Sequence, residues 1–164
     1  HEEQAEQFIE QQLAEYTPRL AWAVPHLFMH KKVFYAGPAF LLDGFLDIAN
    51  TVGMKVPAAA VTARKDYRAR HIRWPYPDPP PVACEPQDRD WYMQYDVLSE
   101  ADLLISDSAL QSGAHTPRLE FGFPCHFHHR LYEVPYLGIA GVAGFLDRVA
   151  DRFSESDRIY SSTR

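Results

Sequence analysis

One strand–helix–strand unit constrains the fold of this chain most. Residues 33–36 and 56–61 are short, wholly apolar segments of the kind that form buried strands. Between them, residues 40–52 repeat large apolar side chains at helical spacing, and Gly53 stands where a helix end favours glycine. A crossover of this length joins parallel strands, and parallel sheets need cover on both faces.

The other patterned segments extend the same alternation of strands and helices. Residues 102–105 and 118–121 predict a third and a fourth strand. Residues 138–153 predict a final helix, and residues 3–16 predict an N-terminal helix that Pro18 ends. We therefore predict a doubly wound α/β fold, with about four parallel strands and helices on both faces, similar to a Rossmann fold.

A proline-rich segment interrupts this pattern. Six prolines between Pro75 and Pro86 exclude regular helix and central strand. We expect residues 63–90 to form a long loop and to be the least ordered internal stretch, followed by a short helix over residues 91–99.

The size and charge of the chain limit its organisation and partners. With 164 residues, the chain fits one domain. We expect an N-terminal helix over residues 1–18, the α/β domain over residues 19–153 and a polar tail over residues 154–164. The net charge of -6 makes nucleic acid an unfavourable partner, and no apolar run is long enough to span a membrane. Without a signal-peptide pattern, we expect a cytoplasmic protein.

Polar and glycine-containing segments follow each predicted strand. They are Gly37-Pro38, Thr62-Ala63, Ser106-Asp107-Ser108 and the loop that begins at Gly122. Because ligands bind at the carboxyl ends of parallel strands, we expect the chemistry at this edge of the sheet. Ser106 and Ser108 could present hydroxyls to a ligand, or the same segment could cap a short helix.

The loop after the fourth predicted strand holds the densest set of reactive side chains. Cys125, His126, His128 and His129 lie within five residues, and Arg130 follows. Imidazole and thiolate suit zinc, iron or copper. The alternative is a polar loop whose histidines bond to backbone or water, since no standard zinc spacing is present. The two cysteines of the chain are too few for a disulfide framework.

Five segments, in order, resemble the nitrogenase component 1 family, which includes nitrogenase subunits, the cofactor-assembly scaffold and the dark-operative protochlorophyllide reductase. They are a strand ending in Gly-x-Pro (32–38), a helix end with Gly-Met (50–54), an Asp-Leu-Leu-Ile strand (101–108), a Gly-Phe-Pro segment (117–124) and Pro-x-Leu-Gly (135–141). The Gly-Phe-Pro form is similar to the C-terminal domain of a β-type subunit. His129 stands where the family has a histidine, seven residues after Gly122.

This resemblance implies a function. It implies a domain of an oxidoreductase that contributes to a metallocluster or tetrapyrrole site and docks an ATP-dependent iron–sulfur reductase. His129 would contact the metal or cofactor, with His126, His128 and Cys125 as further metal ligands and Ser106 and Ser108 as cofactor contacts. The implied partners are nitrogenase-like subunits or further copies of the chain.

The chain also departs from the family pattern. The cysteines that hold the family's bridging iron–sulfur cluster belong to a domain that this sequence does not contain. We therefore expect no reductase activity from the isolated chain. The alternatives are a non-catalytic module that binds a component 1 complex or a metallocluster precursor, and a small metal-binding protein.

Overall fold

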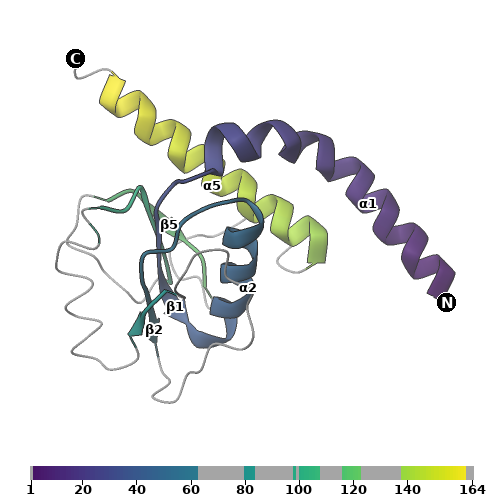
Figure 1. Cartoon of the computed structure of the whole chain (residues 1–164), viewed down its shortest axis with the longest axis horizontal. Coiled ribbons are helices and arrows are strands. Elements are labelled where there is room, and N and C mark those ends of the chain that lie inside the picture. Colours follow the sequence, from purple (N-terminus) through teal and green to yellow (C-terminus); the bar gives the residue numbers. More distant parts are fainter. Residues whose placement is uncertain are drawn as a thin grey trace, which may run out of the picture.

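The computed structural model describes residues 2–62, 80–83, 98, 100–107, 116–122 and 138–161, with side chains through residue 155. Its elements, in chain order, are α1 (Glu2–Ala23), the π-helical turn η1 (Val24–Phe28), β1 (Val33–Pro38), α2 (Ala39–Thr51), β2 (Ala59–Thr62), β3 (Val82–Ala83), β4 (Leu103–Ser106), β5 (Arg118–Glu120) and α5 (Gly138–Ser161). Figure 1 shows the sheet with α2 and α5 beside it, and α1 extending away from it.

Within the described residues, the sheet has five parallel strands in the order β3-β2-β1-β4-β5. The sheet grows outward from β1 in both directions, so the order reverses between β1 and β4. Such a reversal is the position where open α/β sheets bind ligands. The predicted doubly wound α/β class is confirmed.

One strand lies where the sequence predicted only loop. β3 has two residues and falls inside the segment 63–90. It pairs with β2 through Ala59 and Ala60, and the amide of Ala59 donates to the carbonyl of Pro81 at 2.9 Å. A proline beside so short an edge strand is tolerated because its carbonyl still accepts a bond. The remainder of this segment and most of the predicted helix 91–99 lie outside the described residues.

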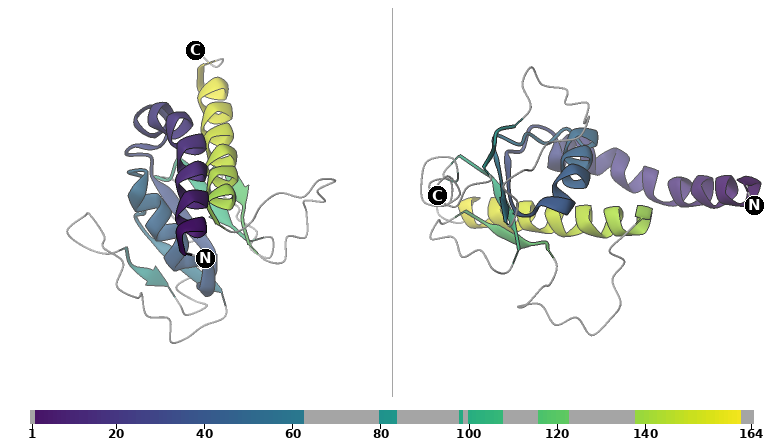
Figure 2. Two further views of the ribbon diagram at one scale, coloured as in Figure 1. Left: turned by 90° about the vertical axis from the view of Figure 1, so that its right-hand side faces the viewer. Right: turned by 90° about the horizontal axis from the view of Figure 1, so that it is seen from below.

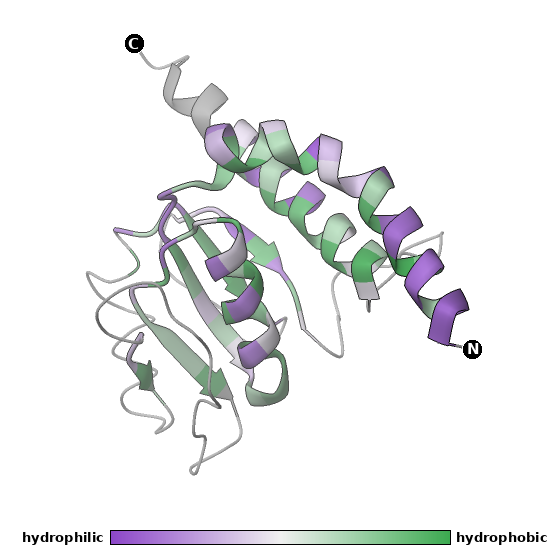
Figure 3. Cartoon of the chain, turned by 45° about the vertical axis from the view of Figure 1, so that its right-hand side comes forward, coloured by the Kyte–Doolittle hydropathy of each residue, from purple (hydrophilic) through white to green (hydrophobic). Residues whose placement is uncertain are grey.

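The main core lies between the sheet and the helices α2 and α5. Tyr35 of β1 stacks on Phe45 of α2 with ring centroids 5.0 Å apart, and Phe145 of α5 meets Phe45 edge-on at 6.4 Å. On the other face, Phe34 and Leu104 pack with Leu98, a helical residue. Figure 3 shows the strands mostly in the hydrophobic colours, with hydrophilic residues along one side of α2.

The unit of β1, α2 and β2 confirms the predicted crossover. α2 ends at Thr51, and Gly53 adopts a φ of +75°, a left-handed conformation that glycine takes at low cost. The amide of Met54 then donates to the carbonyl of Ala49 at 2.9 Å and closes the helix end. β2 begins three residues later than the apolar run suggested.

Both terminal helices are longer than the sequence predicted. α1 continues through Pro18 to Ala23, so the prediction that Pro18 ends it was wrong. The residues beyond Pro18 pack toward the core through Leu20 and Ala23, and this burial offsets the lost backbone bond. α5 likewise runs past residue 153 to Ser161, where a polar tail was expected. Figure 2 shows α1 and α5 side by side, with the N-terminal half of α1 projecting beyond α5.

Candidate functional site

The carboxyl ends of the parallel strands bring together several residues that the sequence singled out. β1 ends at Gly37-Pro38, β2 at Thr62 and β4 at Ser106. Ser106 lies in register with Ala36 of β1 on one side and with Glu120 of β5 on the other. Ser106 and the following Asp107 therefore lie at the reversal of strand order, at the centre of this edge.

Arg118, the first residue of β5, anchors the carboxyl end of β4. Its Nε donates to the Ser106 hydroxyl at 2.6 Å, and one Nη donates to the carbonyl of Asp107. Ser106 has no exposed surface, so its oxygen is held inside the sheet edge. A guanidinium that donates to two neighbouring groups in a fixed fork restrains both of them. The hydroxyl keeps its own proton, so it can still act as a donor.

Two carboxylates are buried at the same edge. Asp107 and Glu120 each expose 8% of their surface. Glu120 extends from the same face of β5 as Arg118, because the two residues are two positions apart in one strand. Buried carboxylates and a guanidinium at one sheet edge form a polar site in an otherwise apolar surrounding. Neither Arg118 nor Glu120 is marked as a site residue by the sequence pattern, since only the strand register brings them beside Ser106.

Gly122 allows the chain after β5 to pass against β4. A Cβ built on Gly122 would stand 2.6 Å from the Cβ of Asp107 and 3.1 Å from its Cα. The amide of Phe121 donates to the carbonyl of Ser106 at 2.9 Å and fixes this approach. There is therefore no room for a larger residue at this position, and the chain leaves β5 directly beside Asp107.

The side chain of Tyr35 bonds to the backbone at the end of its own strand, β1. The Tyr35 hydroxyl donates to the carbonyl of Pro38 at 2.8 Å, and a Cβ on Gly37 would stand 2.9 Å from that hydroxyl. Gly37 thus makes room for a buried tyrosine.

The predicted metal ligands Cys125, His126, His128 and His129 lie outside the described residues, as does Ser108. Among the residues that the structure describes, no three His, Cys, Asp or Glu side chains group closely enough to hold a metal ion. The metal and cofactor roles of these residues stay predictions, as does that of Ser106.

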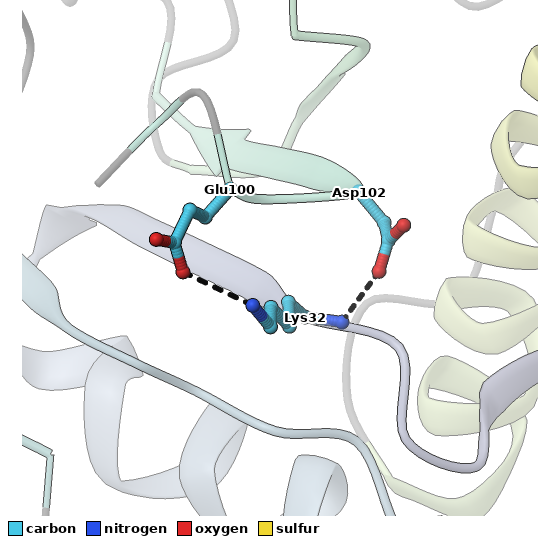
Figure 4. Close-up of polar contacts among 3 residues, drawn as sticks. All are labelled: Lys32, Glu100 and Asp102. Carbon is cyan, nitrogen blue, oxygen red and sulfur yellow. Dashed lines mark hydrogen bonds and ion pairs between the residues drawn. The ribbon is translucent and has the colours of Figure 1, made fainter. Parts of the chain in front are cut away.

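A separate polar cluster holds the opposite, amino ends of β1 and β4 (Figure 4). The backbone amide of Lys32 donates to the Asp102 carboxylate at 2.7 Å, and its Nζ lies 3.0 Å from Glu100 Oε2. The Lys32 and Glu100 side chains are 44% and 67% exposed. An ion pair this exposed contributes little stability, so the cluster sets the strand ends mainly through the backbone contact.

A groove of about 340 Å³ lies between α1 and α5, away from the sheet edge. Tyr16 and Leu20 of α1 form one wall, and Ala143 and Gly144 of α5 form the other. The helices that border it are not membrane spans: none in the described part of the chain has the length and apolarity that crossing a bilayer needs.

Comparison with known proteins agrees with this fold. The model of the family "Nitrogenase component 1 type Oxidoreductase" matches residues 1–154. A solved structure, "Nitrogenase Cp1 at pH 6.5", superposes with a TM-score of 0.63 at 19% identity and covers 92% of this chain. The match covers 34% of that structure's chain, so this chain spans about a third of its length. No curated protein sequence matches significantly. Because the family model covers nearly the whole chain, the protein belongs to the nitrogenase component 1 type oxidoreductase family.

Proposed function

We propose that this chain is a domain that contributes ligands to a metallocluster or tetrapyrrole site of a component 1-like oxidoreductase. The supporting observation is the anchored edge at Ser106, Asp107 and Gly122. The backbone passes Asp107 at Gly122, three residues before Cys125. Metal-binding residues that closely follow a fixed strand end are positioned more precisely than residues on a loop without such an anchor.

The donor set of residues 125–129 fits an iron-containing group. Thiolate and imidazole are ligands that iron takes in clusters and in mononuclear sites. In this proposal His129 binds the metal, and Cys125, His126 and His128 supply further ligands or hydrogen bonds. A cluster bound there would accept and pass on electrons.

The described residues support this site by positioning. Arg118 fixes the Ser106 hydroxyl and the Asp107 backbone, so the segment that follows β4 begins at a fixed position. In the proposal, Ser108 donates a hydrogen bond to the cofactor from this start. Ser106, whose fully buried hydroxyl accepts a bond from Arg118, acts by holding the end of β4. Second groups that fix the ligands of a metal site commonly alter its affinity for the metal.

The proposed partners are nitrogenase-like subunits and an ATP-dependent iron–sulfur reductase. The family to which the chain belongs supports this assignment, and so does the share of the matched structure that the chain spans. A site built at the edge of one domain needs further protein on its open side to exclude water from a reactive metal group. The isolated chain is therefore expected to bind the metal group but not to turn over any substrate.

The replacement of His129 by alanine tests the ligand role. We would reconstitute the chain anaerobically with ferrous iron and sulfide, then measure iron per chain and the thermal midpoint of unfolding. The proposal expects His129→Ala to lose iron while the thermal midpoint of the iron-free chain stays unchanged, because bound iron itself would raise the midpoint. The matched control is His26→Ala in η1, which should retain iron. Unchanged iron with a lowered midpoint would make His129 a structural residue.

A further inference from the structure

The part of α1 that extends beyond α5 carries an exposed apolar strip, formed by Phe8, Ile9 and Leu13. These side chains are 61%, 47% and 49% exposed, and α1 has no buried residue along its length. Figure 2 shows this half of the helix projecting from the rest of the fold. A helical segment of this length is only marginally stable in water by itself. A surface that covers the α1 strip would therefore stabilise it.

The α1 strip leads into the groove between α1 and α5. Ile9, Leu13, Tyr16 and Leu20 follow at four- and three-residue spacing, which places them on one face of the helix. Tyr16 and Leu20 already line the groove of about 340 Å³. The facing wall on α5 includes four small residues, which allow another helix to approach closely: Ala140, Ala143, Gly144 and Ala150. Leu146 and Asp147 complete this wall.

The charges beside the α1 strip select the kind of partner. Glu3, Glu6 and Glu10 follow at three- and four-residue spacing along one flank of the strip, and all three are exposed. Residues 2–18 contain five glutamates and no lysine or arginine; Arg19, which lines the groove, pairs with Glu15 at 3.7 Å. A second α1 would bring like charges together, and an anionic lipid surface would repel this flank. A partner with basic side chains complements it.

We propose that the α1 strip and the adjoining groove bind an amphipathic helix of a polypeptide partner. That helix carries large apolar side chains on one face and Lys or Arg along the flank that meets Glu3, Glu6 and Glu10. This is the arrangement by which an apolar helix face is recognised in a groove between helices. The surface is separate from the sheet edge and does not depend on any metal there.

The probe for this proposal is a designed helical peptide of about 20 residues, with leucines on one face and lysines on both flanks. The reference peptide has glutamate in place of every lysine. Fluorescence anisotropy measures the affinity of each labelled peptide for the 164-residue chain. We expect the lysine peptide to bind at least about tenfold more tightly than the reference. We expect this preference to shrink as salt is raised.

Three variants locate the binding surface. The double variant Phe8→Ser/Leu13→Ser should lower the affinity for the lysine peptide by at least about tenfold, because two large apolar contacts are lost. Glu3→Gln/Glu6→Gln/Glu10→Gln keeps the strip and the helix propensity, and it should remove most of the preference for lysine over glutamate. The matched control is Phe40→Ser in α2. That side chain is 71% exposed but lies outside the strip, so the affinity should not change.

Several results would overturn the proposal. Equal affinity of the chain for both peptides would remove the charge argument. An unchanged affinity in Phe8→Ser/Leu13→Ser, with helix content kept by circular dichroism, would place binding elsewhere. If the chain is a dimer and the double variant is a monomer, the strip would be assigned to a second copy of the chain. Binding to phosphatidylcholine vesicles that the double variant abolishes would assign it to a lipid surface.

Discussion

Replacing Gly122 by alanine should destabilise the protein at the junction of β4 and β5. The new Cβ would lie 2.6 Å from the Asp107 Cβ and 3.1 Å from its Cα. Carbon atoms in contact lie about 3.5–4.0 Å apart, so the two segments must separate by about 1 Å. Both are held by backbone bonds, from Asp107 to the carbonyl of Ala36 at 3.2 Å and from Phe121 to the carbonyl of Ser106 at 2.9 Å.

Overpacking of this kind typically costs about 1–3 kcal/mol. Because backbone stands on both sides, we expect a loss of about 2–3 kcal/mol in the free energy of unfolding. Urea denaturation followed by far-ultraviolet circular dichroism measures this loss. The matched control is Gly44→Ala in α2, where a Cβ would meet nothing within 4 Å. That change should stabilise the protein by about 0.5–1 kcal/mol. A loss below about 0.5 kcal/mol in Gly122→Ala would refute the packing argument.

Three further changes test other contacts by the same denaturation assay. Arg118→Met removes both hydrogen bonds of the guanidinium, and we expect a loss of about 2 kcal/mol; unchanged stability would mean that the anchor is dispensable. Phe145→Ala empties a core position that is 2% exposed and should cost about 3–5 kcal/mol, whereas Phe40→Ala on the surface should stay within about 0.5 kcal/mol. Similar losses at the two positions would contradict the burial pattern. Glu100→Gln removes an exposed ion pair and should change stability by less than about 0.5 kcal/mol at any salt concentration; a larger, salt-dependent loss would oppose this view.

The parts of the fold that depend on local pattern were predictable. β1, α2 and β2 follow from two apolar runs, one helical repeat and Gly53, all within about 30 residues of chain. The continuation of α1 through Pro18 was not predictable, because its cause is the packing of Leu20 and Ala23 on a core whose residues are mostly distant in sequence. β3 was missed because a two-residue strand has no period of its own.

The candidate site also has residues that were predictable from the sequence and residues that were not. The sequence predicts that Ser106 and Gly122 stand at strand ends, since each follows an apolar run. Arg118 was overlooked because its partners, Ser106 and Asp107, are 12 and 11 residues away and meet it only through the β4–β5 register. The metal roles of Cys125, His126, His128 and His129 stay predictions, because these residues lie outside the described part of the chain.

X-ray absorption at the iron edge tests the proposed metal site most directly. The chain would be reconstituted anaerobically with ferrous iron and sulfide, and its spectrum compared with those of His129→Ala and His26→Ala. If His129 binds the metal, the unaltered chain and His26→Ala share an imidazole scattering contribution that is smaller for the iron that His129→Ala retains, because one imidazole ligand is gone. An imidazole contribution that persists undiminished in His129→Ala, or a chain that retains no iron, would contradict the proposal.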